Sequence, residues 1–330
     1  MKFLIIRFSS IGDIVLTTPV IRCLKQQVKD AEIHFLTKQS FAPILENNPY
    51  VDKIITLNFS WELMIHELQN EAYDYVIDLH HNLRTLRVKW SLGKPSFSFD
   101  KLNLKKWLLT AFKINRLPNV HIVERYLATV KSFGVINDEK GLDYFIPEKE
   151  MVAKKDLPLS HEFGYIALVI GAAHATKKLP ITKLKQLCAN INYPIVLIGG
   201  KEDKKAGDII CEGNDIKVYN SCGKFSLNES ADLVRNAHIV ITHDTGLMHI
   251  AAAFKKNIIS VWGNTIPEFG MAPYYGNYSI PNFQFQVPNL SCRPCSKIGH
   301  NNCPKKHFNC MELQNIDTII ESSYTLLKNK

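Results

Sequence analysis

The sequence lacks the features that mark several large classes of protein. Its 330 residues contain no run approaching the ~20 apolar residues that a membrane-spanning helix needs, no low-complexity tract and no short-period repeat. The first apolar run, Met1 to Arg7, is too short for a signal peptide and leads into a polar glycine loop. These absences argue against integral membrane, disordered and solenoid proteins, and they predict a cytoplasmic globular protein.

Two common nucleotide-binding motifs are missing as well. The chain contains no G-x-G-x-x-G fingerprint and no glycine-rich loop that ends in a P-loop lysine. Both motifs serve to bring backbone amides close to phosphates at the start of a helix. An ordinary NAD or ATP site is therefore disfavoured.

The sequence does contain ample material for packed cores. Hydrophobic residues make up 46% and charged residues 22%, as in globular proteins, and 330 residues is long for one core, so two domains are expected. The formal net charge of +9 favours anionic partners. It is concentrated between residues 84 and 125, where ten Lys or Arg stand against two acidic residues. Because no nucleic-acid-reading motif accompanies the charge, nucleic acid is disfavoured.

Short apolar runs alternate with amphipathic stretches, which is typical of an α/β protein with parallel sheets. Charged, proline-bearing sequence at 147–158 predicts a linker between domains 1–155 and 156–330. Each domain is expected to be doubly wound and Rossmann-like, with ligands beyond the carboxyl ends of the strands in a cleft between facing sheets. Residues 316–327 predict a closing helix. The predicted strands are 2–8, 32–36, 53–57, 75–79, 96–99, 165–170, 194–198, 217–219, 239–242 and 257–261.

The first predicted strand runs into a polar turn, Ser9-Ser10-Ile11-Gly12-Asp13, ahead of a helical pattern. Glycine permits close backbone approach in such a turn, and the serines offer hydroxyls and amides to an anion. Asp13 can also be a simple helix cap, a common use of Asp at this place. On spacing alone, capping is slightly favoured over a functional role.

A second polar turn follows a strand of the second domain and reads His243-Asp244-Thr245-Gly246-Leu247-Met248-His249. Asp244 can cap free amides at the helix start, while Thr245 and Gly246 leave others open to a phosphate. His249 lies one turn on from Gly246 and faces the same ligand. A lone helical histidine is more often structural, but a group of polar residues at the end of a strand favours binding.

Two further loops of the second domain can reach the same ligand. Residues 171–180 follow its first strand, and there Thr176 and Lys177 can neutralise a diphosphate leaving group. A solvated lysine pair before a helix is about equally expected at that place. Glu202 follows the next strand in a turn with two glycines, and a carboxylate at that rim can bind ribose hydroxyls.

Taken together, the two turns make the sequence resemble glycosyltransferase family nine, the ADP-heptose to lipopolysaccharide heptosyltransferases. Ser9-Ser10-Ile11-Gly12-Asp13 and Asp244-Thr245-Gly246-Leu247-Met248-His249-Ile250-Ala251-Ala252 stand where that family has them, and the resemblance covers essentially the whole chain. It implies the two-domain GT-B fold and an ADP-activated heptose donor in the carboxyl domain. It also implies a lipopolysaccharide-core or lipid A-linked acceptor in the amino domain.

The resemblance implies a role for each matching residue. Asp13 would be the general base, Thr176 and Lys177 would meet the diphosphate, and Glu202 would meet the ribose. The acceptor would lie against the loop formed by Ser9, Ser10 and Gly12. The donor would be bound by Thr176, Lys177, Glu202, Asp244, Thr245, Gly246 and His249.

The chemistry of an inverting transfer is consistent with these roles. One carboxylate must take the proton of the acceptor hydroxyl as that hydroxyl attacks the anomeric carbon. The charge that develops on ADP must be offset by a divalent metal or by fixed positive charge and helix dipoles. Because the chain has no Asp-x-Asp motif, a lysine with a helix N-terminus is favoured. Catalysis is therefore expected to require no metal or other cofactor.

The basic stretch offers contacts for an acidic acceptor and for a membrane. Arg84 and Arg87 follow a predicted strand and are candidates for acidic sugars or phosphates. Residues 101–113 combine lysines with Leu, Trp and Phe, which suits peripheral contact with an anionic inner-membrane or glycolipid surface. A helix packed by its apolar face, with solvated lysines outside, is roughly as well supported.

Four cysteines near the end of the chain are spaced Cys292-x2-Cys295-x7-Cys303-x6-Cys310, with two histidines between them. Structural disulfides are not expected in a reducing compartment. Four thiols that include a Cys-x-x-Cys pair have the ligand count of a structural zinc site. An iron–sulfur cluster and reduced, unligated thiols are the alternatives.

The sequence therefore predicts an inverting transferase that moves heptose from ADP-heptose to a lipopolysaccharide inner-core acceptor. A different nucleotide sugar or surface-glycan acceptor is the alternative within the same chemistry. A non-catalytic nucleotide-sugar-binding protein and a sugar-nucleotide epimerase on the same fold are alternatives from other classes.

Overall fold

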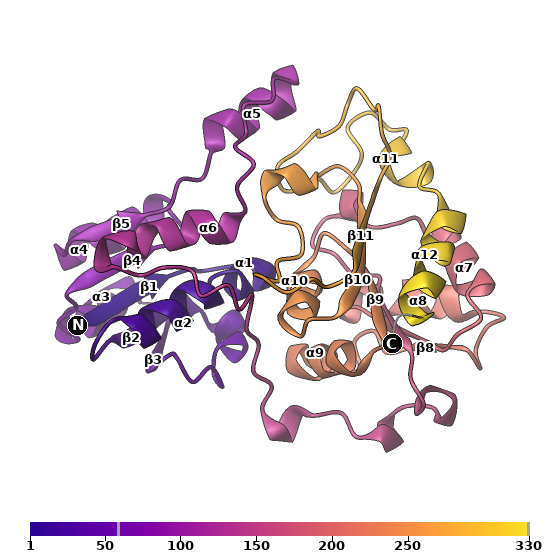
Figure 1. The fold of residues 1–330 in the computed structure, drawn as a ribbon, viewed down its shortest axis with the longest axis horizontal. Coiled ribbons are helices and arrows are strands. Elements are labelled where there is room, and N and C mark those ends of the chain that lie inside the picture. Colours follow the sequence, from indigo (N-terminus) through magenta and orange to yellow (C-terminus); the bar gives the residue numbers. More distant parts are fainter. Residues whose placement is uncertain (58–59, 329–330) are drawn as a thin grey trace. The chain divides into compact units, whose positions relative to one another are not determined.

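The computed structural model describes residues 1–57 and 60–328, and the chain packs into two compact units (Figure 1). Residues 103–119, although they come early in the sequence, pack with the second unit. The predicted boundary between residues 155 and 156 stays a prediction. Unit 1 consists of residues 1–102, 120–145 and 275–278, and unit 2 of residues 103–119, 146–274 and 279–330.

Unit 1 is built on a five-stranded parallel sheet with the order β3-β2-β1-β4-β5. Helices α3 and α4 contribute to the apolar core on one face, while α2 packs against α6 (Figure 1). The strands are β1 (Lys2–Ile6), β2 (Glu32–Lys38), β3 (Lys53–Leu57), β4 (Tyr75–Asp78) and β5 (Ser96–Ser98). The helices are α1 (Ile11–Val15), α2 (Thr18–Gln27), α3 (Trp61–Asn70), α4 (Leu83–Leu92) and α6 (Ile122–Leu127).

Local sequence explains where several of these elements begin and end. Phe3 to Ile6 are fully buried because β1 is the central strand and is covered on both faces. Helix α3 begins where the hydroxyl of Ser60 accepts the backbone N–H of Leu63. Helix α4 ends at Gly93, whose φ of +61° is left-handed and costs glycine little.

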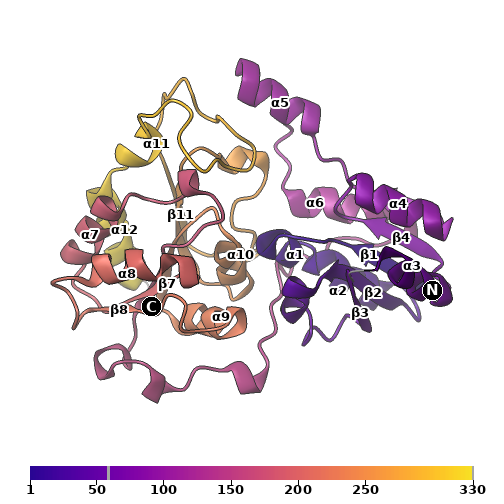
Figure 2. The ribbon, with the colours of Figure 1, turned by 180° about the vertical axis from the view of Figure 1, so that it is seen from behind.

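Unit 2 is built on a six-stranded parallel sheet with the order β11-β10-β9-β6-β7-β8. Its core lies between the sheet and α7, α8 and α12, and α9 packs against α10 (Figure 2). The strands are β6 (Ile166–Val169), β7 (Ile195–Ile198), β8 (Val218–Asn220), β9 (Ile239–His243), β10 (Asn257–Trp262) and β11 (Asn282–Gln286). The helices are α5 (Asn103–Phe112), α7 (Ile181–Asn190), α8 (Lys204–Cys211), α9 (Leu227–Asn236), α10 (Gly246–Ala253), α11 (Asn309–Glu312) and α12 (Ile316–Lys328).

The predicted α/β class and every predicted strand are confirmed, with ends that move by one or two residues. The segment at 147–158 contains short 3₁₀ turns rather than a strand or an α-helix. The sequence prediction omitted β11, an edge strand. Within the described residues, no helix is long and apolar enough to cross a membrane.

Both sheets have a point at which the strand order reverses. In unit 1 this point lies between β1 and β4, and in unit 2 it lies between β6 and β9. Doubly wound sheets bind their ligands beyond the carboxyl ends of the strands at such a point. The polar turns singled out in the sequence follow β1, β6 and β9, so they stand at these two places.

Candidate functional site

The turn after β1 places Asp13 in the first turn of α1, where two neighbours hold its carboxylate. Arg7 Nη2 lies 2.7 Å from Asp13 Oδ1, and the hydroxyl of Ser10 donates to Oδ2 at 2.8 Å. The Ser10 N–H also donates to Oδ2, at 3.2 Å. The N-cap of α1 is Ser10, and Asp13 takes part in the predicted capping from the third helical position, where it accepts the Ser10 N–H. The same carboxylate forms a partly buried ion pair with Arg7.

Burial by itself would raise the pKa of Asp13. The charge of Arg7 and the hydrogen bonds from Ser10 outweigh burial and hold that pKa below its usual value. The carboxylate is therefore ionised at neutral pH. A group in this state can accept a proton, and it needs no further activation to do so.

Arg7 is a site residue that the sequence analysis did not single out. It lies just past the end of β1 and is only 8% exposed. Its Nε donates to Ser9 O at 2.7 Å and its Nη1 to Leu79 O at 2.5 Å, and its guanidinium lies over the Tyr126 ring. A charged residue at the end of an otherwise apolar run was the signal available in the sequence. These contacts fix the cation that orients Asp13.

The turn after β9 brings Asp244 and Lys177 together. Lys177 Nζ lies 2.6 Å from Asp244 Oδ2, and Thr265 Oγ1 donates to the same oxygen at 2.8 Å. The N-cap of α10 is Thr245, and its helix begins at Gly246. The structure therefore places the predicted lysine beside the predicted helix start, where an anion would find both a cation and free amides.

Two histidines near this turn are buried. His249 is 2% exposed within α10. His243, at the end of β9, accepts the backbone N–H of Leu179 on Nε2 at 3.0 Å. Burial lowers the pKa of His243 to about 4, so it is neutral at physiological pH. His243 thus anchors the loop that carries Lys177.

Thr176 and Glu202 differ in what their side chains already contact. The Thr176 hydroxyl donates to His300 O at 3.0 Å and accepts the His300 N–H at 2.8 Å. Glu202 is exposed, while the neighbouring Asp203 is buried and pairs with Lys178 at 2.6 Å. The Thr176 hydroxyl is thus occupied by backbone groups, and Glu202 offers its carboxylate to solvent. Their donor-binding roles stay predictions.

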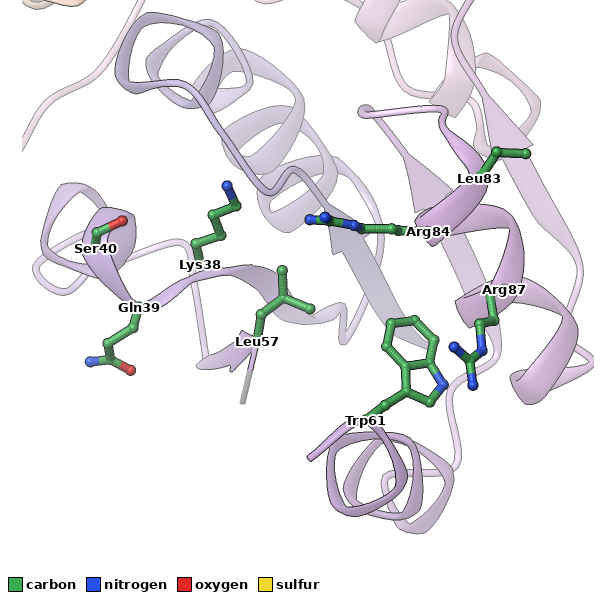
Figure 3. Close-up of a pocket in the computed structure, with 8 residues that line it drawn as sticks. All are labelled: Lys38, Gln39, Ser40, Leu57, Trp61, Leu83, Arg84 and Arg87. Atoms are coloured by element: carbon green, nitrogen blue, oxygen red, sulfur yellow. The ribbon is translucent and has the colours of Figure 1, made fainter. Parts of the chain in front are cut away.

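A pocket of about 750 Å³ in unit 1 contains both predicted arginines (Figure 3). Arg84 and Lys38 extend into it, and among the described residues neither has a carboxylate partner. The guanidinium of Arg87 lies 4.5 Å from the centre of the Trp61 ring. The pocket is lined by Lys38, Gln39, Ser40, Leu57, Trp61, Leu83, Arg84 and Arg87.

This pocket presents positive charge beside an aromatic ring, a combination that suits an anionic sugar derivative. The sequence analysis missed Lys38 and Trp61. They come from the end of β2 and the start of α3, so no local motif links them to Arg84. Only the sheet order, which places β2 beside β1 and β1 beside β4, brings these segments to one edge.

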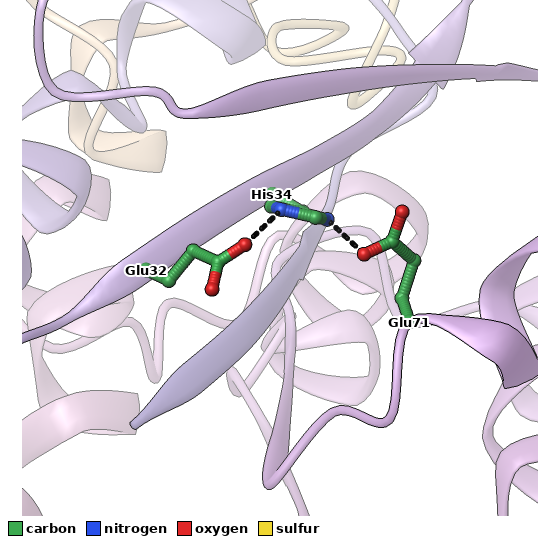
Figure 4. Close-up of side chains that lie close together, drawn as sticks. All are labelled: Glu32, His34 and Glu71. Atoms are coloured by element: carbon green, nitrogen blue, oxygen red, sulfur yellow. Dashed lines mark hydrogen bonds and ion pairs between the residues drawn. The ribbon is translucent and has the colours of Figure 1, made fainter.

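One group of side chains has the spacing of metal ligands: Glu32, His34 and Glu71 (Figure 4). His34 Nε2 lies 2.9 Å from Glu32 Oε1, and its Nδ1 lies 3.7 Å from Glu71 Oε2. Two ammonium groups already neutralise the carboxylates, because Lys2 pairs with both and Lys53 pairs with Glu71 at 2.7 Å. This cluster is better described as a salt-bridge network.

Its position and protonation agree with that description. The cluster lies where β1, β2 and β3 begin, at the sheet edge opposite Asp13. Hydrogen bonds from Lys2 and Lys53 lower the pKa of Glu71 to about 2, and burial lowers the pKa of His34. A neutral histidine between two lysine-paired carboxylates supports sheet packing and takes no part in the candidate site.

The four predicted zinc ligands lie in and just after a segment without helix or strand. Cys292, Cys295 and Cys303 are half-buried, and Cys310 is buried at the start of α11. Within the described part of the chain, no set of three ligand atoms that includes these thiols lies within 4.8 Å of one another. Cys292 Sγ lies 3.8 Å from Nε2 of His307. The structural zinc stays a prediction.

Comparison with known proteins gives consistent results. Residues 61–304 match the family model described as glycosyltransferase family 9 (heptosyltransferase). Lipopolysaccharide heptosyltransferase 1 of Campylobacter coli is 30% identical over 290 residues, which span 80% of this chain and 84% of that protein.

Solved structures show the same fold. The glycosyl transferase family 9 protein from Veillonella parvula superposes with a TM-score of 0.76 at 21% identity, over 100% of this chain and 98% of the other. E. coli ADP-heptose lps heptosyltransferase II gives 0.75 at 20% identity, over 100% and 99%. The fold is therefore of the GT-B type, as predicted, and the chain is a glycosyltransferase that belongs to family 9, the heptosyltransferase family.

Proposed function

We propose that the protein transfers heptose from ADP-heptose to a lipopolysaccharide inner-core acceptor, with inversion at the anomeric carbon and without a catalytic metal. The observation that carries this proposal is the family match together with the sequence similarity to a lipopolysaccharide heptosyltransferase. The donor follows from the solved neighbour whose name includes ADP-heptose. The ionised carboxylate of Asp13, at the carboxyl end of the central strand, supplies the base that such a transfer needs.

Asp13 acts as the general base. The acceptor hydroxyl oxygen forms a bond to the anomeric carbon while its proton passes to the Asp13 carboxylate, and the bond to the diphosphate breaks, so that ADP leaves with the electron pair. The lowered pKa makes Asp13 a weak base. It suffices because the hydroxyl becomes strongly acidic as its oxygen bonds to carbon, and because the carboxylate is already ionised at neutral pH.

Lys177 and the start of α10 stabilise the departing ADP. Lys177 now pairs with Asp244 at 2.6 Å, and the phosphate oxygens of the donor would compete for the same ammonium group. Gly246 and Thr245 leave backbone amides at the positive end of an eight-residue helix. Fixed charge of this kind offsets developing negative charge without a metal ion. In the same proposal, Glu202 binds the ribose and His249 faces the sugar.

The acceptor lies against unit 1. Its acidic sugars or phosphates enter the pocket that holds Arg84 and Arg87, where Lys38 adds a third cation. Ser9, Ser10 and Gly12 shape the loop that brings the reacting hydroxyl to Asp13. Because Arg84 and Lys38 have no carboxylate partner in the part of the chain that the structure covers, binding an anion there breaks no existing ion pair.

Helix α5 makes peripheral contact with the anionic inner-membrane surface, on the side that faces the cytoplasm. Leu104, Trp107 and Phe112 are all more than half exposed on this helix. Lys105 is exposed on the same helix. Exposed aromatic and aliphatic side chains beside lysines are the composition that binds an anionic lipid interface. The acceptor's lipid anchor makes such a position useful.

A transfer assay tests the function. Purified protein with ADP-heptose and a truncated core acceptor should release ADP and form a heptosylated product with inverted anomeric configuration, in the presence of a chelator. If product forms only with another nucleotide sugar, that sugar and not ADP-heptose is the donor. Donor binding without transfer would identify a binding protein, and conversion of donor alone would identify an epimerase.

A further inference from the structure

Helix α4 of unit 1 carries apolar side chains on its solvent side as well as on its core side. Toward the core, Thr85 and Val88 are fully buried. On the opposite side, Leu83, Leu86 and Trp90 are 84%, 40% and 81% exposed. At about 100° per residue, these three side chains leave the helix within an arc of about 60°, opposite Val88. We call these three residues the outer face of α4.

The outer face contributes nothing to the packing of unit 1. Within the described residues, no segment of the chain covers Leu83 or Trp90. A helix that only packs on a core carries polar residues toward solvent. Single exposed leucines are common on protein surfaces, but a tryptophan and two leucines on one helix face form a contiguous apolar patch, which marks an interaction surface.

The charges around the outer face are all positive. Residues 79–99 contain four Lys or Arg and no Asp or Glu. Lys89 turns inward and pairs with the buried Asp78 at 3.0 Å. The other three, Arg84, Arg87 and Lys94, are exposed, and among the described residues none of them pairs with a carboxylate. The partner of the outer face should therefore be anionic.

This charge argues against a second copy of the chain as the partner. In a two-fold dimer the same patch meets itself, so the exposed cations of one copy would face those of the other. An anionic bilayer suits the outer face better. Apolar side chains enter the boundary between headgroups and acyl chains, lysines and arginines meet lipid phosphates, and tryptophan is enriched at that depth.

The outer face is continuous with the pocket of unit 1. Leu83, Arg84 and Arg87 all belong to α4 and line that pocket (Figure 3). Leu83 therefore belongs both to the outer face and to the pocket wall. A lipid surface that binds the outer face lies next to the pocket, so a sugar attached to a lipid could enter the pocket while its anchor stays in the bilayer.

We propose that the outer face of α4 docks unit 1 on an anionic phospholipid bilayer. Leu83, Leu86 and Trp90 enter the headgroup region, and Lys94 meets lipid phosphates. This contact is separate from that of α5, which belongs to unit 2. It holds the pocket at the level of the headgroups, where a lipid-anchored acceptor presents its sugars. The proposal rests on the proposed function only for the identity of that acceptor.

Vesicle binding tests the proposal on the full-length protein. On vesicles of phosphatidylglycerol and phosphatidylcholine, Leu86→Ser/Trp90→Ser should have a partition coefficient at least about tenfold below that of wild type. The matched control is Leu159→Ser/Phe163→Ser in unit 2, where the two side chains are 78% and 91% exposed, and it should bind like wild type. Wild type should bind less tightly at high salt and on pure phosphatidylcholine. Wild type that does not bind the anionic vesicles, or a double variant that binds them as wild type does, would overturn the proposal.

Fluorescence tests the docking without disrupting the outer face. The chain has four tryptophans, and Trp61→Phe/Trp107→Phe keeps only Trp90 and the buried Trp262. Vesicles of lipids brominated near the headgroup should quench this protein, and adding Trp90→Phe should abolish the quenching. Binding through α5 alone would leave Trp90 unquenched and refute the proposal. So would a dimer of wild type that Leu86→Ser/Trp90→Ser dissociates in gel filtration, because a second copy would then cover the outer face.

Two acceptors separate docking from transfer. With a water-soluble core oligosaccharide, Leu86→Ser/Trp90→Ser should match wild type, and with a lipid-anchored acceptor in anionic vesicles its kcat/KM should fall about tenfold. Equal rates for the two proteins on the vesicle-bound acceptor would show that docking does not serve the acceptor. If wild type binds vesicles through Trp90 but transfers heptose to neither acceptor, the proposed function fails and the docking surface stands.

Discussion

Asp13 and Asp244 occupy comparable places in the two units, just beyond the carboxyl end of a strand at the reversal point of its sheet. Each lies within 2.7 Å of a cation, Arg7 for Asp13 and Lys177 for Asp244. The two cations differ in what else holds them. Arg7 is fixed by two backbone carbonyls and by the Tyr126 ring, while Lys177 has no further partner among the described residues.

The Arg7–Asp13 pair is therefore permanent, whereas the Lys177–Asp244 pair can be exchanged for another partner. The guanidinium of Arg7 cannot leave Asp13 without breaking buried hydrogen bonds, so the pair keeps the carboxylate charged and oriented. The ammonium of Lys177 sits on a flexible side chain and can turn from Asp244 to a phosphate. The same residue type at the same topological position can therefore serve as a base in one unit and as a ligand-dependent partner in the other.

The largest expected effect comes from Asp13→Asn, which removes the proton acceptor at nearly constant size. We expect kcat to fall by about 10²- to 10⁴-fold, the usual contribution of a general base. ADP affinity, measured by calorimetry, should stay within about twofold of wild type, a change of about 0.4 kcal/mol or less, because Asp13 belongs to the acceptor unit. Unchanged transfer would reject Asp13 as the base.

Lys177→Met should have the next largest effect. It removes the charge that offsets the leaving ADP, so kcat/KM for the donor should fall about 10²-fold, with weaker ADP binding. Lys185→Met on α7 is the matched control, since its exposed pair with Glu212 contributes little. Equal kinetics for the two variants would show that Lys177 does not meet the diphosphate.

Arg7→Met removes the ion pair with Asp13 and should change how activity depends on pH. Because Arg7 holds the pKa of Asp13 down, its loss should move the acid limb of the kcat/KM profile to higher pH and lower activity on the order of tenfold at neutral pH. The pair's contribution to folding is present above the ordinary carboxyl pKa and is lost as pH falls through the lowered value. Acid unfolding of wild type, followed by circular dichroism, should therefore begin at lower pH than that of the variant. If the kcat/KM profiles of wild type and Arg7→Met coincide across the pH range, Arg7 does not position or charge Asp13.

The smallest effect expected concerns the unit 1 pocket. Arg84→Gln should raise the acceptor KM about fivefold and leave the donor KM unchanged, because it removes from the pocket a cation that has no carboxylate partner among the described residues. Arg87→Gln should raise the acceptor KM by less than Arg84→Gln does, because the Arg87 guanidinium already lies over the Trp61 ring. If Arg87→Gln raises the acceptor KM more than Arg84→Gln does, Arg87 and not Arg84 is the main contact for the anion.

Much of the fold could be predicted because most of its strands are short apolar runs that alternate regularly with amphipathic helices. Strand β11 escaped because its residues, Asn-Phe-Gln-Phe-Gln, alternate polar with aromatic side chains at a half-exposed edge of the sheet. None of its five residues is fully buried, so β11 lacks the continuous apolar run by which the inner strands of the sheet can be recognised in the sequence. Residues 103–119 pack with the second unit through contacts such as Leu109 with Ile266 and Phe269, which no local pattern encodes.

The candidate site could be predicted where one motif holds several of its residues. Asp244, Thr245 and Gly246 are consecutive, so a strand followed by a helix start revealed them together. Arg7, Lys38 and Thr265 were missed because each belongs to a different element and meets the site only through strand order. Thr176 is the opposite case. Its place in the sequence predicted a donor ligand, but its hydroxyl is hydrogen-bonded to backbone more than a hundred residues away.

The wholly parallel pairing of both sheets also bears on how the chain reaches this state. No two neighbouring strands can be joined by a tight hairpin, so every pairing closes a long loop before it gains any hydrogen bonds. Such topologies fold slowly and expose apolar strands meanwhile. Refolding from denaturant should therefore be slow and lose yield as protein concentration rises, and synthesis at reduced temperature should increase the fraction that reaches the native state.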